Sequence, residues 1–177
     1  MQSELTYAIM PAGPGDAAQL ARVHVQSWRE TYSGILPQPY LDAMSIPRHA
    51  RQWRRRLMST DEVTLAAEGA EGLVGYCSGG DARWRTPGEA EITTLYVLRQ
   101  AQGAGLGRRL LTDTARVLAA RGATALVVWV LQDNHAARAF YERLGGRLEG
   151  RGDEAVGGAL TASVSYVWRD LAGLIGR

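Results

Sequence analysis

The stretch Gln102-Gly-Ala-Gly-Leu-Gly-Arg108 joins a predicted strand to a predicted helix. Residues 92–97 are largely β-branched and apolar, which is typical of a buried strand. After the stretch, apolar residues and one threonine recur at steps of three and four, which predicts one buried face of a helix: Leu106, Leu110, Leu111, Thr114, Val117 and Leu118. Alternate glycines let a ligand approach the backbone, and the free N–H groups at the start of a helix favour an anion. The stretch therefore predicts a phosphate-binding loop, with a plain connecting turn as the alternative.

Two common nucleotide loops do not fit these residues. A dinucleotide fingerprint needs a third glycine where this chain has Arg108, and an acidic residue about twenty residues further on, which is missing. The P-loop needs a lysine, and the chain contains none. A nucleotide-binding domain is therefore disfavoured.

The spacing that fits is Q-x-x-G-x-G, with Gln102, Gly105 and Gly107. It resembles the pyrophosphate loop of the GNAT superfamily of N-acetyltransferases. The resemblance implies that the preceding strand pairs with the pantetheine arm of acetyl-CoA, through Leu95, Tyr96 and Val97. It further implies that loop amides hold the pyrophosphate, along the run Gln102, Gly103, Ala104, Gly105, Leu106, Gly107 and Arg108.

A second block, residues 133–146, supports the first. Asp133 or Asn134 is predicted to cap a helix that ends at Gly145. The order N-x-x-A-x-x-x-Y-x-x-x-G, at Asn134, Ala137, Tyr141 and Gly145, is similar to the other half of the GNAT cofactor site. The resemblance places Asn134 and Ala137 in the cofactor site, with Asn134 against the pantetheine arm, and Tyr141 near the sulfur.

Acetyl transfer to an amine needs an acid for the leaving thiolate, a donor for the oxyanion and an acceptor for the amine proton. Tyr141 is the predicted acid, because a phenol is protonated at neutral pH; the alternative is that it only packs beside Phe140. A backbone N–H of residues 95–97 would meet the oxyanion if that strand splays from its neighbour, as in the family. Glu91 is the predicted base, with Glu89 next in line and water as the alternative.

Three aromatic residues are predicted to line the acceptor pocket: Trp28, Tyr32 and Trp84. Aromatic faces attract cationic amines, although core packing is the alternative, above all for Trp28. Arg83 and Arg85, on either side of Trp84, would instead attract an acidic acceptor. The identity of the acceptor amine and the length of the acyl group stay open.

The remaining pattern predicts an α/β fold: a single mixed, mostly antiparallel twisted sheet with helices on both faces, in one N-acetyltransferase domain over residues 1–177. The expected strands cover residues 5–10, 63–67, 73–78, 91–97, 125–131, 146–150 and 163–169. The expected helices cover residues 17–31, 38–58, 103–121 and 136–144, the second interrupted at 45–47. This order matches the GNAT fold, and residues 23–37 also resemble the substrate-side helices of a bacterial GNAT branch that includes polyamine acetyltransferases, without fixing a substrate.

Composition narrows the function classes. A single cysteine, Cys77, excludes an internal disulfide, and three scattered histidines predict no metal site. The net charge is only +2, so the arginines of residues 51–56 predict a solvated helix face rather than a nucleic-acid surface. Neither a signal peptide nor an eighteen-residue apolar run is present, which predicts a cytoplasmic protein without a membrane partner. A homodimer is left open.

These observations favour an acetyl-CoA-dependent N-acetyltransferase that acts on a primary amine of a small molecule or a peptide, by direct attack in a ternary complex. The alternative is a non-catalytic acyl-CoA-binding sensor that has kept the cofactor loop and lost turnover.

Overall fold

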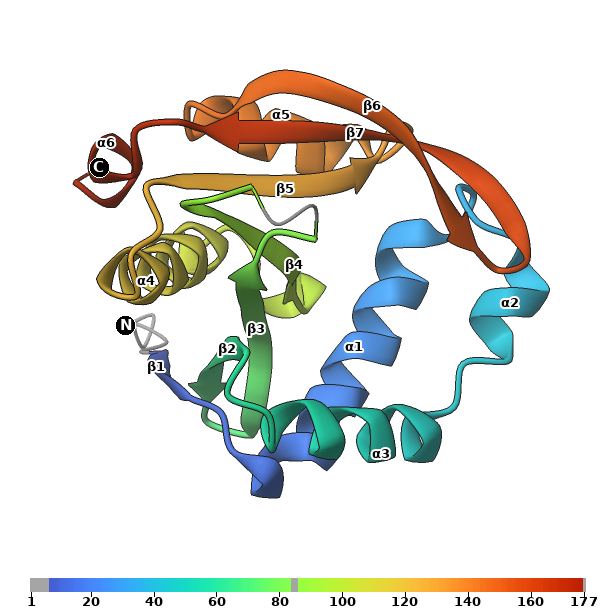
Figure 1. The fold of residues 1–177 in the computed structure, drawn as a ribbon. Coiled ribbons are helices and arrows are strands. Elements are labelled where there is room, and N and C mark those ends of the chain that lie inside the picture. The colour runs from blue at the N-terminus through green and yellow to red at the C-terminus, as the bar shows by residue number, and fades with distance from the viewer. Residues whose placement is uncertain (1–6, 84–85, 177) are drawn as a thin grey trace.

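The structure, a computed structural model, describes residues 7–83 and 86–176. The strands within these residues form one sheet in the order β1-β2-β3-β4-β5-β7-β6 (Figure 1). They are β1 (Ala8–Pro11), β2 (Glu62–Gly69), β3 (Gly72–Asp81), β4 (Glu89–Val97), β5 (Ala125–Leu131), β6 (Arg147–Val156) and β7 (Ala159–Trp168). Only β4 and β5 are parallel neighbours; the other pairs are antiparallel. The predicted mixed, mostly antiparallel sheet is confirmed.

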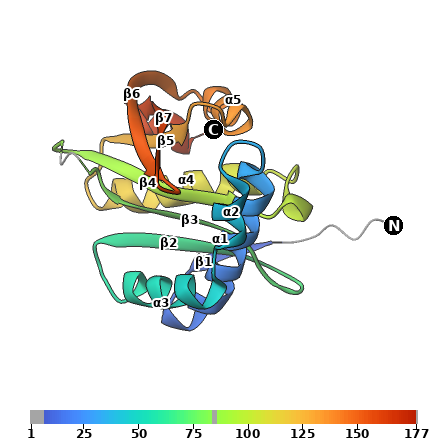
Figure 2. The ribbon, with the colours of Figure 1, turned by 90° about the vertical axis from the view of Figure 1, so that its right-hand side faces the viewer.

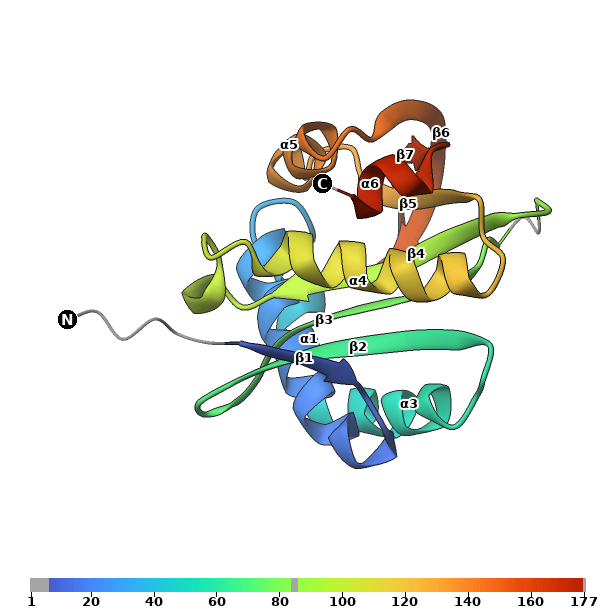
Figure 3. The ribbon, with the colours of Figure 1, turned by 90° about the vertical axis from the view of Figure 1, so that its left-hand side faces the viewer.

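Helices cover both faces of this sheet. They are α1 (Ala17–Tyr32), α2 (Gln38–Asp42), α3 (Ile46–Leu57), α4 (Leu106–Ala120), α5 (His135–Arg143) and α6 (Leu171–Ile175), with 3-10 turns at Pro14–Asp16 and Arg99–Ala101. Figures 2 and 3 show α4 against one face and α1 with α3 against the other. Leu110 and Leu111 of α4 and Leu20 of α1 are fully buried, so the main core lies on both sides of the central strands. Within the described ranges, no helix has the length and hydropathy that a membrane crossing requires.

The two parallel strands diverge towards their C-terminal ends. Pairing between β4 and β5 ends at Ile92 and Val128, although β4 continues to Val97 and β5 to Leu131. A bulge lies where this divergence begins, because Thr93 has no partner between two successive pairs of β3 and β4. An extra residue bends a strand and increases its twist. β4 therefore splays from β5, as the resemblance to the GNAT fold implied.

The C-terminal strands are longer than the sequence predicted. Gly157 and Gly158 both have positive φ, +62° and +82°, and form a two-residue turn between β6 and β7. Such a turn matches the twist of paired strands and needs residues that tolerate positive φ. The prediction ended the first strand at 150; apart from Val156 and Leu160, residues 151–162 are polar or small and lack an apolar alternation. The helix α6 was also missed.

Two helix boundaries differ for local reasons. The helix predicted over 103–121, α4, begins at Leu106 and not at 103, because Gly103 and Gly105 have φ of +82° and +72°, outside the helical region. The helical region predicted over 38–58 is interrupted as expected, but the break between α2 and α3 lies at residues 43–45 and not at 45–47. Ser45 caps α3 by accepting a hydrogen bond from the Arg48 amide, and Pro47 fits its first turn.

Candidate active site

A cavity of about 600 Å³ lies where β4 and β5 diverge. Most of the residues predicted for the site line it: Trp28, Tyr32, Leu95, Tyr96, Val97, Gln102, Gly103, Gly105, Leu106, Gly107, Arg108, Asn134, Ala137 and Tyr141. Ala104 and Glu91 are not among the lining residues, and Trp84 lies outside the described residues. Segments far apart in the sequence are thus brought to one cavity.

The loop before α4 carries a run of free backbone donors. Within the described residues, none of the amides from Gly103 to Arg108 donates a hydrogen bond to the protein; the first that does is Arg109, to the Gly105 carbonyl. Gly105, at the N-cap, is left-handed, which turns the chain into the helix. The Gln102 side chain donates to the Val97 carbonyl at 2.9 Å and ties the loop to β4. This loop suits a pyrophosphate.

Backbone amides on one edge of β4 point into the cavity. The Leu98 amide donates to the Val74 carbonyl on β3, and the alternation of an antiparallel ladder then directs the Tyr96 amide to β3 as well. The amides of Leu95 and Val97 point the opposite way, into the space that β5 has left. With no strand partner among the described residues, these two amides are available to an extended ligand or to an oxyanion.

The helix α5 closes the cavity from the side of β5. Asn134 caps it by accepting a hydrogen bond from the Ala137 amide at 3.2 Å, which confirms one of the two predicted caps. The Phe140 ring lies 3.5 Å from the position that a Cβ on Gly107 would take, so α5 and the phosphate loop are in contact. Arg143 is one turn beyond Phe140 and also lines the cavity. Arg108 and Arg143 thus give this end of the cavity positive charge.

Tyr141 of α5 has a free hydroxyl in this cavity. The residue is 6% exposed and packs against Phe140, Tyr166 and Trp168. Its hydroxyl makes no hydrogen bond to the described protein, yet it is not one of the fully enclosed polar atoms, so it opens into the cavity. Burial, with Cys77 and Tyr32 nearby, raises the pKa of Tyr141 above its usual value. The phenol therefore stays protonated at neutral pH and can donate a proton.

Glu91 is placed differently from the prediction. The residue is 1% exposed, and its carboxylate accepts hydrogen bonds from the side chain of Arg83 at 2.8 Å and from the Arg83 amide at 3.0 Å. A second carboxylate, Glu154 of β6, accepts from Nη1 of Arg83 at 2.7 Å. The structure therefore shows Glu91 as the buried anchor of an arginine and not as a group on the cavity wall.

The far end of the cavity combines α1 with the β6–β7 hairpin. Trp28 and Tyr32 come from α1, and Tyr32 shares a hydrogen bond of 3.0 Å with the Tyr96 hydroxyl. Glu154 and Val156 come from β6, whose turn packs Gly157 against the Tyr40 ring. Trp129 of β5 and Arg83 complete this end. Arg83 was a candidate from its place beside Trp84, whereas Trp129, Glu154 and Val156 were not predicted from the sequence. Because these wall residues come from segments far apart in the sequence, no local sequence pattern indicates that they share a cavity.

Comparison with known proteins decides the family. The model of the Acetyltransferase (GNAT) family matches residues 25–146, which include the loop, the diverging strand and α5. The chain belongs to this family. The uncharacterized N-acetyltransferase YuaI of Bacillus subtilis is 30% identical over 160 residues, 90% of this chain and 91% of that protein.

Solved structures agree with the GNAT fold. The PaiA N-acetyltransferase of Thermoplasma acidophilum in complex with coenzyme A has a TM-score of 0.70 at 20% identity, over 90% of this chain and 98% of that one. An acetyltransferase of Thermus thermophilus has a TM-score of 0.68 at 25% identity, over 93% of this chain and 97% of that one. GNAT acetyltransferases use acetyl-CoA.

The N-cap of α5 in this GNAT protein is tested by Asn134→Ala. Because the cap satisfies the Ala137 amide, its removal is expected to lower the free energy of unfolding by about 1 kcal/mol, measured by urea denaturation. Asn134→Asp keeps an acceptor oxygen and serves as the control, with a smaller loss. An Asn134→Ala variant as stable as the wild type would show that the cap is not needed.

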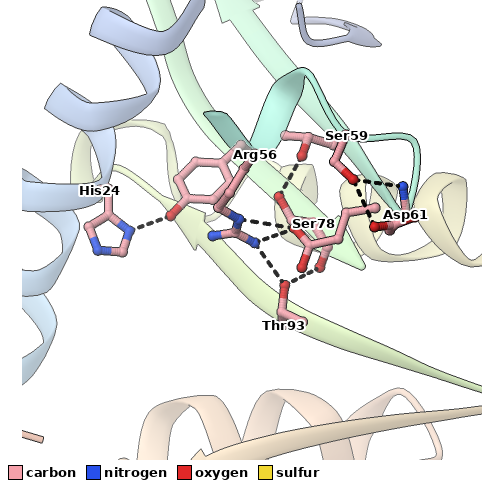
Figure 4. A network of polar contacts seen from close by, with 9 residues as sticks. His24, Arg56, Ser59, Asp61, Ser78 and Thr93 are labelled. Carbon is pink, nitrogen blue, oxygen red and sulfur yellow. Dashed lines mark hydrogen bonds and ion pairs between the residues drawn. The ribbon is translucent and has the colours of Figure 1, made fainter. Parts of the chain in front are cut away.

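Behind the cavity, a polar network joins α1 to β3 and α3 to β2 and β4 (Figure 4). Arg56 pairs with Glu62 and donates to Oγ1 of Thr93, the bulge residue that lines the cavity. Arg51, Arg54 and Arg55 are exposed, as predicted for a solvated face, but Arg56 is half-buried and lies over the Trp53 ring. That part of the prediction is corrected: Arg56 is a tie between α3 and the sheet.

His24 lies in the same network, with Nδ1 2.7 Å from the Tyr76 hydroxyl. Burial, followed by the nearby charges of His49 and Arg56, lowers the pKa of His24 from 6.5 to about 3. His24 is therefore protonated below about pH 6.5 in the unfolded chain, but only below about pH 3 in the native state. The contribution of His24 to stability is complete above pH 6.5 and is lost as the pH falls towards 3.

We therefore expect the unfolding free energy to decrease on acidification, with a share of up to about 1.4 kcal/mol per pH unit from His24. His24→Gln, which keeps a hydrogen-bonding side chain beside Tyr76, should flatten the profile between pH 6 and pH 4. The control is His135→Gln, because His135 is exposed. Identical slopes for wild type and His24→Gln, in denaturant titrations at each pH, would contradict the assignment.

Proposed function

We propose that this protein transfers an acetyl group from acetyl-CoA to a primary amine of a small molecule or peptide, by direct attack in a ternary complex. One observation carries the proposal: the cavity between the diverging strands joins a loop of free amides at one end to an unbonded Tyr141 hydroxyl in its wall. A thioester held by the loop and by the β4 edge has its sulfur within the same enclosed space as the phenol.

The chain supplies the groups that bind and orient acetyl-CoA. The amides of Gly103 to Arg108 and the N-terminus of α4 hold the pyrophosphate, and Arg108 and Arg143 add positive charge beside it. The inward amides of Leu95 and Val97 continue the site as a strand edge, with Asn134 and Ala137 on the facing helix. Holding both reactants in one cavity turns a bimolecular encounter into a positioned one.

The reaction then needs a donor to the carbonyl oxygen, a proton for the departing sulfur and an acceptor for the amine proton. As the amine attacks the thioester carbon, an inward amide of β4 donates to the carbonyl oxygen, which can contribute about 3 kcal/mol. Tyr141 donates its proton to the departing sulfur. We assign removal of the amine proton to water, because the Glu91 carboxylate is held by Arg83 and does not line the cavity.

The test is release of free thiol from acetyl-CoA in the presence of polyamines, aminoglycosides, amino acids or short peptides. Turnover with one class of acceptor, and a mass increase of one acetyl group on that acceptor, would support the proposal. Tight acetyl-CoA binding without turnover on any amine would favour the acyl-CoA-binding sensor. Absence of acetyl-CoA binding would contradict both. A cytoplasmic location and a homodimer stay predictions.

A further inference from the structure

The distal end of the cavity has one arginine and two carboxylates. Arg83 is paired with both, since Nε and Nη2 contact the Glu91 carboxylate and Nη1 contacts Glu154, although its side chain is 42% exposed. An acidic acceptor that approached the guanidinium would also approach these two carboxylates, which together outweigh its single positive charge. Of the two arginines for which the sequence suggested an acidic acceptor, Arg83 is thus neutralised by carboxylates, and Arg85 lies outside the described residues.

Glu154 has a carboxylate oxygen to spare. Its Oε1 accepts from Arg83, whereas Oε2 has no hydrogen bond or ion pair within the described residues. The side chain is 32% exposed and belongs to the cavity wall. Val156, two residues further on and on the same face of β6, packs against the cluster that contains Tyr32 and Trp28. Glu154 is therefore on the cavity side of the hairpin, close to aromatic rings.

The charges of the two ends differ in sign. Arg108 and Arg143 lie at the phosphate-loop end, beside Gly107 and Phe140. At the distal end Glu91, Arg83 and Glu154 leave one net negative charge, and it is bordered by the aromatic side chains of Trp28 and Tyr32. Carboxylates and aromatic faces both attract an ammonium group.

We infer that the acceptor is a diamine-like molecule, whose second, unreacted ammonium group binds Oε2 of Glu154, with Arg83 and the buried Glu91 holding that carboxylate in place. This inference rests on the proposed function and specifies its acceptor. Glu91 is then a positioning residue that acts through Arg83, and Glu154 is the residue that determines specificity.

The experiment compares acceptors that differ only in the distal group: 1,4-diaminobutane, butylamine and 4-aminobutyrate, with the corresponding five-carbon set. We expect kcat/KM to fall by about tenfold from the diamine to the neutral amine and further for the amino acid. Glu154→Gln should remove the preference for the diamine through KM, with little change in kcat. The control is Glu149→Gln, since Glu149 is also a β6 carboxylate paired with an arginine, Arg169, but does not line the cavity.

Binding to the CoA-loaded protein, measured by calorimetry, gives a second readout that needs no turnover. Tighter binding of the diamine than of butylamine, lost in Glu154→Gln and kept in Glu149→Gln, would support the inference even if acetyl transfer failed. Equal turnover and equal binding of the three acceptors would overturn it while leaving the acetyltransferase proposal intact. A preference for 4-aminobutyrate would overturn it as well.

Discussion

Replacing Tyr141 by phenylalanine is expected to lower kcat by about 100-fold and to leave the KM for acetyl-CoA nearly unchanged. The phenol is the one acidic hydroxyl that we place next to the sulfur, and its raised pKa keeps it protonated over the working pH range. Because the hydroxyl has no hydrogen-bond partner in the described protein, its loss should not lower the thermal midpoint. Steady-state kinetics and thermal unfolding test the two halves of this expectation.

The matched control is Tyr166→Phe. The ring of Tyr166 lies 6.0 Å from that of Tyr141, but its hydroxyl donates to Glu142 at 2.6 Å and does not line the cavity. This variant should keep kcat and lose stability, about 1 kcal/mol for the hydrogen bond. If Tyr141→Phe retained the kcat of the wild type, water would be the acid and the role of Tyr141 would be wrong.

The phosphate loop provides the second large effect, through Gly105→Val. The φ of Gly105 is +72°, a conformation that a β-branched residue adopts only with strain. The loop must then change its shape, and the run of amides from Gly103 to Arg108 no longer points at one anion. We expect the dissociation constant of acetyl-CoA to rise by about 100-fold or more, measured by calorimetry.

Gly122→Val is the control that distinguishes a loss of acetyl-CoA binding from a loss of stability caused by backbone strain. Gly122 follows the other end of α4, has a φ of +103° and has no atom within 4 Å of an added Cβ, as is also true of Gly105. Both variants should lose stability, about 1–3 kcal/mol each, but only Gly105→Val should lose acetyl-CoA affinity. Equal affinities in the two variants would show that the loop does not bind the pyrophosphate.

The features that could be predicted from the sequence are local. Strand β5 has the predicted bounds, 125–131. An unbroken apolar run between polar ends is typical of a buried strand and marks both of its ends. The loop at 102–108 was predicted since glycine spacing and a following helix are encoded in consecutive residues. Asn134, Ala137 and Tyr141 were placed in one site by the resemblance to the GNAT motif, and they lie at the N-cap and on one face of α5.

Other features depend on contacts between distant segments. The β6–β7 hairpin is stabilised by its Gly157-Gly158 turn and by packing on Tyr40, more than a hundred residues earlier, and its polar strands give little local signal. Glu91 was predicted as a base from its place on the cofactor strand. Its partner Arg83 is eight residues away, and the partner of Arg83, Glu154, is seventy-one residues away.

Local patterns of neighbouring residues predicted the fold class, the glycine-rich loop before α4 and the helix that carries Tyr141, because each follows from periodicity and backbone preferences. The side chains that face the distal end of the cavity, and their net charge, depend instead on packing between segments far apart in the sequence. The sign of that charge depends on which carboxylates reach Arg83, and this is set by how β4 and the β6–β7 hairpin meet across the sheet.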